Sequence, residues 1–402
     1  MFGLYEMAFA GLTWGNILMF CLAGAMIYLG IIKKMEPLLL VPIGFGIILV
    51  NVPFAGLMTH TQPTELGAVP MPVEVQGGLT EIMRAMSKGE VGILNLIYQF
   101  GIQGEIIPLL MFLCIGAMTD FSPCIARPIY LLFGAATQLG VFVVLILALL
   151  THQFQLGEAA SIGIIGGATG PVAVYFAVAK APHLLGPIAL VAYSYMALVP
   201  MIQPPVIKAL TSKKQRQIYM KPQFREVSKL EKIIFPIAIF IVTALFVPKA
   251  APLIGMLMFG NLLYVCGVTD RLAQSASTIF VDILTILLTL TVGALMPAVV
   301  FLNIKTLAII VLAAIAFVIC TAGGIWAVQI ANLFLKEKIN PLIGAAGVSA
   351  IPMAARVAQI EGQKANPRNF LLMHAMGPNM AGAIGCSVAA GIFLTMVPAT
   401  IL

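Results

Sequence analysis

The chain has 402 residues, of which 61% are hydrophobic and only 9% are charged. Soluble globular proteins carry about 25% charged residues, so this composition excludes an ordinary soluble fold. The formal net charge of +7 does not indicate nucleic-acid binding, because basic residues gather in one segment between apolar runs. The composition predicts an all-α, polytopic membrane protein.

Apolar stretches of spanning length recur along the whole chain. Several are too short or too interrupted to cross a bilayer alone, so we expect nine to eleven transmembrane helices plus re-entrant pieces. The stretches lie at about residues 12–32, 38–57, 91–118, 129–150, 159–179, 184–206, 233–248, 252–268, 278–303, 306–332, 340–358 and 369–401. No soluble domain interrupts them, so residues 1–402 are predicted to form a single integral membrane domain.

This domain divides into four parts. Residues 1–90 hold the first spans and a polar connection whose low positive charge suits the outer face of the membrane. Residues 208–232 form a loop rich in Lys and Arg, which the positive-inside rule places in the cytoplasm. A docking surface for an acidic partner is a compatible second interpretation of this loop. On either side of it lie two halves with interrupted helices, 91–210 and 233–402.

Helix-breaking residues occur in the middle of apolar segments. SIGIIGGATGPVAVYFAVAK spans 161–180 and NPLIGAAGVSAIPMAARVAQ spans 340–359, and MHAMGPNMAGAIG at 373–385 adds a third break. Non-helical backbone at membrane depth requires burial in protein or a watery cavity, and paired breaks point to a transporter binding site. The alternative, glycines that allow close helix packing, requires neither the Gly-Pro pairs nor the adjoining Asn.

The breaks bring oxygen atoms into apolar surroundings. Freed backbone carbonyls together with Thr169, Asn340, Ser349 and Asn379 could form an oxygen cage. Hard cations such as Na⁺ favour oxygen ligands, by the logic that governs Ca²⁺ and Mg²⁺. Because unsatisfied amides in hydrocarbon cost several kcal/mol, we predict that Asn340, Ser349 and Asn379 share one polar cavity. The dispersed Cys and His residues predict no other metal site.

Other polar residues stand out in the apolar segments. Arg356 is a lone cation beside the second break, and a guanidinium can hold a carboxylate through two hydrogen bonds. The alternative is an arginine that reaches to the membrane boundary. Tyr193 and Tyr195 lie near a Gln-Pro-Pro break, where an aromatic interface belt would explain one of them more easily than both. Glu105 follows a Gly-Ile-Gln-Gly turn and is expected to mark a bend or an interface.

A set of motifs between Gly116 and Gly382 is similar to the beta subunit of sodium-pumping, biotin-dependent decarboxylases. These enzymes act on oxaloacetate, methylmalonyl-CoA, glutaconyl-CoA or malonate. The motifs are GAMTDFSP, AASIGIIGGATGP, AYSYMALVPMIQPP, PLIGMLMFGNLL, EKINPLIGAAGVSAIPMAARV and NFLLMHAMGPNMAG. The resemblance implies a multi-pass subunit of the bacterial cytoplasmic (inner) membrane with two inverted, interrupted-helix (re-entrant) motifs.

The resemblance also implies the activity and the partners. A carboxyltransferase subunit loads biotin on a biotin carrier protein, and this subunit decarboxylates the carboxybiotin and exports Na⁺ while a proton is consumed. A small single-span gamma-type subunit, membrane lipid and a homo-oligomeric arrangement are expected as well. The chain has no Met-Lys-Met biotin-attachment motif, so the biotin is expected on a partner.

Motif position assigns roles to individual residues. The resemblance implies Na⁺ binding by Thr169, Asn340, Ser349 and Asn379, catalysis by Arg356, Ser349 and Tyr195, and contact with carboxybiotin by Arg356, Asn340 and Gly344.

Thr169 departs from the family pattern, which reads GGADGP with an aspartate at this position. That aspartate is thought to bind Na⁺ and to exchange it for a proton. Threonine offers an oxygen but neither a charge nor accessible titration, so we expect Na⁺ coupling to be weakened. Two alternatives stay open at this point: a decarboxylase subunit that no longer pumps Na⁺, and a non-enzymatic secondary transporter of organic anions that uses Arg356 as its carboxylate clamp.

Overall fold

The computed structural model describes residues 11–58, 84, 91–221 and 225–398, and the regular elements of this part of the chain are all helices. The predicted all-α class is confirmed. The elements are α1 (Trp14–Ile31), α2 (Pro37–Asn51), α4 (Ile93–Ile97), η3 (Tyr98–Gln103), α5 (Ile106–Met118), α6 (Ser122–Ala126), α7 (Ile129–Thr137), α8 (Leu139–Leu150), α9 (Leu156–Ile165), α10 (Gly170–Lys180), η4 (Pro182–Leu184), α11 (Leu185–Leu210), α12 (Lys213–Arg216), α13 (Lys229–Phe246), η5 (Pro248–Ala250), α14 (Ala251–Val265), α15 (Asp270–Ser275), η6 (Ala276–Phe280), α16 (Val281–Ala294), α17 (Ala298–Phe301), α18 (Ile304–Phe334), α19 (Leu342–Ala345), α20 (Met353–Ala365) and α21 (Leu372–Met396). The polar connection predicted before residue 90 lies, apart from Arg84, outside the described residues.

Long apolar helices confirm that the chain is a membrane protein. Six helical stretches of the described chain are long and apolar enough to cross a bilayer, and a bent pair raises this number to seven. That pair, Ile93–Gln103 and Ile106–Met118, bends by 62°. Glu105 lies at the bend with a φ of +60°, so the bend expected there is confirmed. α2, α9 and α10 are apolar but shorter than a full membrane span, so they are not counted among these helices. The predicted total of nine to eleven spans therefore stays a prediction.

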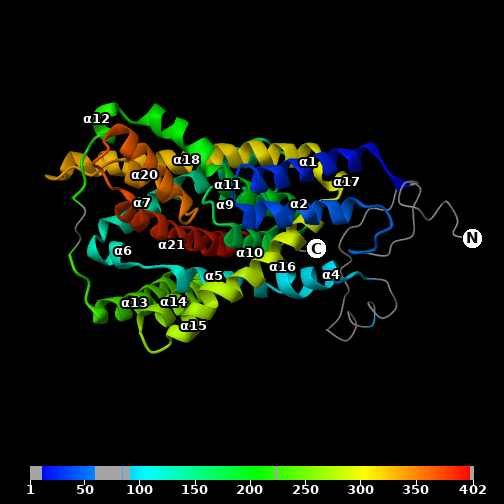
Figure 1. The fold of residues 1–402 in the computed structure, drawn as a ribbon, viewed down its shortest axis with the longest axis horizontal. Coiled ribbons are helices and arrows are strands. Elements are labelled where there is room, and N and C mark those ends of the chain that lie inside the picture. Colours follow the sequence, from blue (N-terminus) through cyan, green and yellow to red (C-terminus); the bar gives the residue numbers. More distant parts are fainter. Residues whose placement is uncertain (1–10, 59–83, 85–90, 222–224, 399–402) are drawn as a thin grey trace, which may run out of the picture.

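The helices run mostly along the long axis of the molecule, with α9, α10 and α21 in its middle (Figure 1). α9 packs against α8, α10 and α18, and α21 packs against α7, α10 and α20. Every residue from Gly157 to Ile165 and from Gly170 to Ala177 is buried. A helix that is apolar on all sides and buried all round is enclosed by protein rather than exposed to lipid. The first broken segment therefore lies in the protein core.

α9 and α10 form a hairpin whose two ends lie together. A Cβ atom built at Gly157, near the start of α9, would lie 2.6 Å from the carbonyl oxygen of Lys180, the last residue of α10. α11 then runs for 26 residues from this end to Leu210 at the basic loop, a length of about 39 Å. The first hairpin therefore enters and leaves at the end of the molecule opposite the basic loop.

The second broken segment forms a hairpin from the other end. Before α19, Asn340 Nδ2 donates to the carbonyl oxygen of Arg216 at 2.9 Å. At the end of α20, the carbonyl oxygen of Ala365 accepts a hydrogen bond from Gln217 Nε2 at 3.2 Å. Both ends of this hairpin thus contact the basic loop. The inverted, re-entrant arrangement expected from the resemblance is confirmed.

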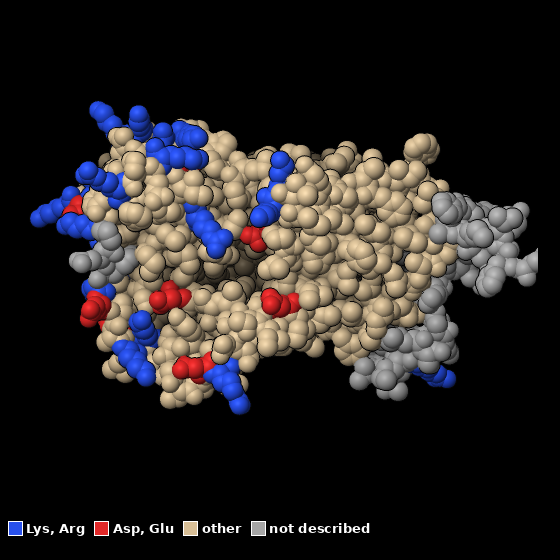
Figure 2. All heavy atoms as spheres, viewed as in Figure 1, with Lys and Arg blue, Asp and Glu red and all other residues tan. Residues whose placement is uncertain are grey.

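Positive charge gathers at one end of the molecule. Figure 2 shows most Lys and Arg side chains at the left, around α12 and α20, while the described surface at the right is nearly free of charged residues. Two serines of the basic loop cap helices at this end. Ser212 Oγ accepts a hydrogen bond from Gln215 N at the start of α12, and Ser228 Oγ accepts one from Glu231 N at the start of α13. The asymmetry fits a cytoplasmic position for this end.

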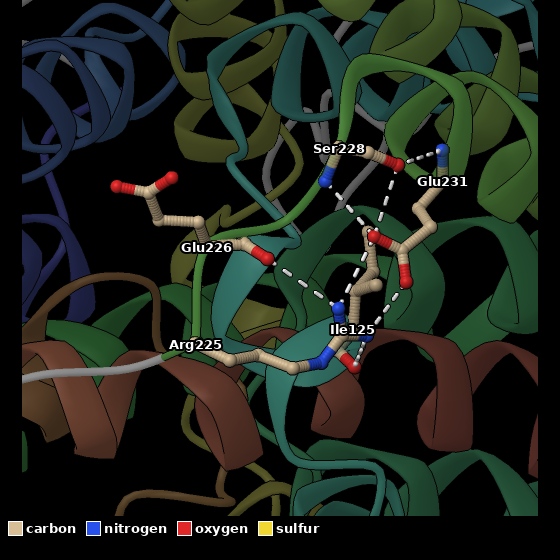
Figure 3. Close-up of polar contacts among 5 residues, drawn as sticks. All are labelled: Ile125, Arg225, Glu226, Ser228 and Glu231. Atoms are coloured by element: carbon tan, nitrogen blue, oxygen red, sulfur yellow. Dashed lines mark hydrogen bonds and ion pairs between the residues drawn. The ribbon is translucent and has the colours of Figure 1, made fainter.

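A two-pronged ion pair fixes the chain before α13 (Figure 3). Arg225 donates from Nη1 and Nη2 to the two carboxylate oxygens of Glu231 at 3.1 and 2.7 Å, and Nη2 also donates to the Ile125 carbonyl oxygen at 3.3 Å. The hydrogen bonds from Arg225 hold the pKa of Glu231 at about 2, below its ordinary value of 4.5. A depressed pKa means that the contact is fully present above pH 4.5 and is lost as the pH falls toward about 2.

Glu231→Gln is expected to release this segment at neutral pH, because the amide keeps the shape but loses the charge that binds Arg225. The measurement is limited trypsin cleavage after Arg225, which should become several-fold faster. Glu226→Gln is the matched control, since the Glu226 side chain points away from the guanidinium and only its carbonyl accepts from Arg225 (Figure 3). Equal protection of Arg225 in the parent and in Glu231→Gln would contradict the assignment.

Candidate functional site

The turns of the two hairpins meet in the core. The backbone N–H of Ser349 donates to the Gly167 carbonyl oxygen at 3.1 Å. The hydroxyl groups of Thr169 and Ser349 are hydrogen-bonded to each other, and both residues are buried. Segments that enter from opposite ends of the molecule therefore touch through polar atoms at their tips. We call this meeting point, formed by residues 166–169 and 346–349, the crossing.

The sequence GGATGP explains the first turn. Ala168 has a φ of +53°, a left-handed conformation that costs a non-glycine residue about 1–2 kcal/mol. Thr169 is the N-cap of α10 in extended conformation, and Pro171 occupies the first turn of that helix. Proline is tolerated there because its missing N–H would have no helical partner. These residues end α9 and begin α10, and such local strain is typical of functional sites.

Asn379 holds the second turn. Its side chain is fully buried on α21, and Nδ2 donates to the carbonyl oxygens of Ala346 and Val348, each at 2.8 Å. The structure thus brings Asn379 to the turn that carries Ser349, as the sequence predicts for these two residues. The amide oxygen Oδ1 has no hydrogen-bond partner among the described residues.

Five buried polar side-chain atoms of the described chain lack a partner: Gln138 Oε1, Tyr193 Oη, Gln203 Oε1, Thr321 Oγ1 and Asn379 Oδ1. Three of them are amide oxygens whose amide nitrogens donate to carbonyl groups. An unpaired buried acceptor costs about 1–3 kcal/mol, so each one calls for an explanation such as a bound ion or water. Oxygen acceptors of this kind fit a hard cation such as Na⁺.

The two tyrosines of the AYSYM motif have different surroundings. A Cβ atom built at Gly170 would lie 2.4 Å from Tyr193 Cε1, so the Tyr193 ring packs on the first residue of α10, next to Thr169. Tyr195 instead donates its hydroxyl to the Ile310 carbonyl oxygen at 2.6 Å and ties α11 to α18. The catalytic role assigned to Tyr195 by resemblance stays a prediction, and Tyr193 is the one beside the crossing.

Asn340 makes its contacts away from this group. Nδ2 donates to the carbonyl oxygens of Arg216 and Ile218, each at 2.9 Å, and Oδ1 accepts from the backbone of Leu342 at 3.1 Å. These bonds fasten the basic loop to the start of α19. No hydrogen bond of Asn340 within the described chain supports the predicted cavity shared with Ser349 and Asn379, and its ion and cofactor roles stay predictions.

Gly344 lies where α19 crosses α18. A Cβ atom at Gly344 would lie 2.1 Å from the Gly324 carbonyl oxygen and 2.6 Å from Val328 Cγ2. The backbones of the two helices therefore approach as closely as small residues permit. This packing accounts for a glycine at position 344 without a ligand, so the predicted contact with carboxybiotin stays a prediction.

Gly344→Ala is expected to destabilise the protein, because the added methyl group forces α19 away from α18. Overpacking of this kind costs about 1–3 kcal/mol, and the thermal unfolding midpoint in detergent should fall by several degrees. Gly24→Ala is the matched control in a membrane helix, since a Cβ atom there has no neighbour within 4 Å. An unchanged midpoint for Gly344→Ala would contradict the close approach.

Arg356 lies in the first turn of α20, directly after the second break, and its side chain is exposed. It forms no ion pair with the described residues, although its charge reaches Glu36 at the start of α2. Burial raises the pKa of the Glu36 carboxyl, and the Arg356 cation opposes this shift. An exposed guanidinium without a carboxylate in direct contact is suited to bind an anion from outside the chain.

The end of the first hairpin that lies opposite the basic loop carries an acid that the sequence analysis missed. The Glu158 side chain is 5% exposed, and His183 Nε2 and Lys305 Nζ lie 2.7 and 3.7 Å from Glu158 Oε1. Glu158 Oε2 accepts from Gln155 N at 2.7 Å, which caps α9. The capping-box signature begins with Ser, Thr, Asp or Asn, and because Gln155 is none of these, the spacing of Gln155 and Glu158 gave no signal that could have identified this residue. Gln138, one of the unpaired amides, carried no signal either.

Comparison with known proteins gives the family. The family model for the Na⁺-transporting oxaloacetate decarboxylase beta subunit matches residues 15–397. The chain belongs to this family. It is 51% identical to the methylmalonyl-CoA decarboxylase subunit beta of Propionigenium modestum over 392 residues, which cover 98% of this chain and 97% of that one.

Other members of the decarboxylase beta subunit family are similar over nearly their full length. The glutaconyl-CoA decarboxylase subunit beta of Acidaminococcus fermentans is 48% identical, with 98% of this chain and 96% of the relative covered. The oxaloacetate decarboxylase beta chain of Klebsiella pneumoniae is 46% identical, with 95% of each chain covered. The resemblance stated from the motifs is confirmed, and the relatives differ in the substrate that their names give.

Proposed function

We propose that this beta subunit decarboxylates carboxybiotin presented by a partner protein and couples the reaction to Na⁺ export. The observation that carries the proposal is the crossing, where two inverted hairpins join buried hydroxyl groups beside unpaired amide oxygens. Broken helices that meet inside a membrane protein are the usual setting of a transported ion. The relatives' names, which describe decarboxylase beta subunits, support the chemical half of the proposal.

Arg356 is proposed to bind the carboxylate of carboxybiotin. Its side chain is exposed directly after the second break, where an anion from outside the chain can contact it. When the bond between the carboxyl carbon and the biotin nitrogen breaks, the electron pair stays on nitrogen, CO₂ leaves, and one proton binds the nitrogen. The proton that this step consumes moves positive charge in the direction opposite to the export of Na⁺.

The transported cation is proposed to bind at the crossing, with oxygens from Thr169, Ser349 and Asn379. Each hairpin closes one side of this point, because the first enters from the outer end and the second from the basic end. A cation held between the two tips can reach either face only when the corresponding hairpin shifts. This arrangement would let one event, the loss of CO₂ near Arg356, change access to the ion.

The partners follow from the chemistry. Biotin must come from a biotin carrier protein, which a carboxyltransferase subunit loads. A gamma-type subunit and further copies of this chain are proposed neighbours in a bacterial cytoplasmic membrane. Strongly exposed apolar residues at the end of α13, such as Leu245 and Phe246 at 77% and 84% exposure, offer surfaces for lipid or for such subunits.

The deciding experiment measures carboxybiotin decarboxylation by the purified complex in liposomes, with and without Na⁺, together with ²²Na⁺ movement and an avidin blot. We expect a biotinylated companion, Na⁺-stimulated decarboxylation and coupled ²²Na⁺ transport. Decarboxylation without ²²Na⁺ movement would leave an enzyme that no longer pumps. Anion transport by the chain without a biotinylated partner would overturn the enzymatic proposal.

A further inference from the structure

Gln138 is a buried amide in the middle of a membrane-spanning stretch. It lies at the junction of α7 and α8, within the span Ile129–Leu150, and is 5% exposed. A primary amide in apolar surroundings needs partners for both its nitrogen and its oxygen. The hydrogen bonds of the nitrogen determine how the amide is turned, and so they determine which part of the protein the oxygen faces.

The amide nitrogen of Gln138 is bound to α21 and to the adjacent Thr137. Nε2 donates to the Gly382 carbonyl oxygen at 3.3 Å and to Thr137 Oγ1 at 3.2 Å. Thr137 Oγ1 lies within hydrogen-bond distance of the carbonyl oxygens of Gly134 and Gly347, at 2.6 and 3.0 Å. Only the nitrogen of the amide can donate to a carbonyl group, so these contacts determine which way the amide is turned.

The amide oxygen of Gln138 faces the first turn. A Cβ atom built at Gly167 would lie 3.4 Å from Oε1, and Gly167 is two residues from Thr169. Oε1 has no hydrogen-bond partner among the described residues. The nearby N–H groups of Gly167 and Ser349 already donate to the carbonyl oxygens of Ile164 and Gly167, so these backbone donors are not available to it.

The acceptors around the crossing are neutral. No group of three or more His, Cys, Asp or Glu side chains in the described chain could hold a metal ion. Neutral amide, hydroxyl and carbonyl oxygens without a carboxylate fit a monovalent cation better than a divalent one, because tight divalent sites in proteins are built with carboxylates. A cation bound here would also keep its full charge, which predicts modest affinity.

We propose that Gln138 Oε1 is a ligand of the monovalent cation at the crossing, an additional neutral oxygen in a site that lacks a carboxylate on residue 169. This assignment rests on the proposed function. It adds the junction of α7 and α8 to the two hairpins and α21 as a fourth contributor to the site. It also gives the unpaired buried oxygen of Gln138 its missing partner.

The test is direct equilibrium binding of ²²Na⁺ to the purified complex without carboxybiotin, so that the readout is independent of decarboxylation. Gln138→Met keeps the length of the side chain and removes the oxygen, and we expect about a tenfold or larger loss of Na⁺ affinity. Gln138→Glu keeps an oxygen and adds a negative charge, and we expect tighter binding of Na⁺. Ca²⁺ should not compete with Na⁺ in the parent.

Gln203→Met is the matched control. Gln203 is also buried with an unpaired oxygen, but its nitrogen binds the Ala345 carbonyl oxygen at 2.7 Å, one residue before the second turn, and no hydrogen bond within the described chain joins it to residues 166–169. Parent affinity in both Gln138 variants, or an equal loss in Gln203→Met, would overturn the assignment, as would a parent that binds no Na⁺. If the Gln138 variants shift Na⁺ binding while the parent decarboxylates without Na⁺, the ligand assignment holds and the coupling proposal fails. If Gln138→Met does not fold, the Glu variant decides the assignment.

Discussion

Arg356→Lys is expected to lower the rate of carboxybiotin decarboxylation by about a hundredfold, a loss of the size seen when one positioned donor is removed from an active site. Lysine keeps the positive charge but loses the planar fork that binds both oxygens of a carboxylate. Arg356→Ala should lose at least as much, because it removes the charge as well. The measurement is the decarboxylation rate of free and carrier-bound carboxybiotin by the purified complex.

Arg368→Lys provides the control for this change. Arg368 is also exposed and follows the end of α20, and its backbone N–H donates to Asn366. It lies at the far end of the helix from the second break, so the same substitution should leave the rate unchanged. Parent rates in both Arg356→Lys and Arg356→Ala would remove Arg356 from the reaction.

Thr169→Asp is expected to raise the apparent Na⁺ affinity tenfold or more. A carboxylate about 4 Å from a monovalent cation, at an effective dielectric constant near 20, contributes up to roughly 4 kcal/mol before desolvation. Even a fraction of this energy changes affinity tenfold. The turn already has Thr169 in an extended N-cap conformation, which suits aspartate as well as threonine. The backbone should therefore need no rearrangement.

Two measurements check this prediction, namely Na⁺ activation of decarboxylation and ²²Na⁺ uptake into liposomes. Thr169→Asn separates charge from shape, because asparagine has the size of aspartate without its charge, and it should fall well short of the aspartate variant. A parent that already pumps Na⁺ as tightly as Thr169→Asp would show that the carboxylate is dispensable here. The proposed role of residue 169 in ion coupling would then be wrong.

The sequence predicted the crossing better than it predicted the path of the chain. Gly-Pro pairs and hydroxyl residues inside apolar runs are local signals, and they led to Thr169, Ser349 and Asn379. The stretch 159–179, in contrast, reads as one apolar segment of spanning length. The structure divides it into two short helices that return to the same end. Composition does not distinguish a span from such a hairpin, because both bury apolar residues.

Contacts that sequence analysis did not foresee depend on distant partners. The sequence predicts Asn340 as an ion ligand because its amide lies in an apolar segment, and this role stays a prediction, but the carbonyl groups that bind its nitrogen lie more than 120 positions away in the chain. Gln138 and Glu158 become notable only when the unpaired oxygen of one and the two basic neighbours of the other are seen in three dimensions. Such contacts leave no spacing pattern in the chain.

The contact between Thr169 and Ser349 joins residues 180 positions apart, and this separation has a consequence for biosynthesis. The first hairpin leaves the ribosome long before its partner exists. Until the second half of the chain is inserted, the Gly167 carbonyl and the Thr169 hydroxyl have only their long contact with each other, at 3.4 Å, and lack the Ser349 groups that bind them in the finished protein. A polar tip of this kind is costly inside lipid. The first hairpin can therefore reach its final position only after the last third of the chain has been synthesised. In an incomplete chain, this polar tip would stay exposed to the cell's quality-control machinery.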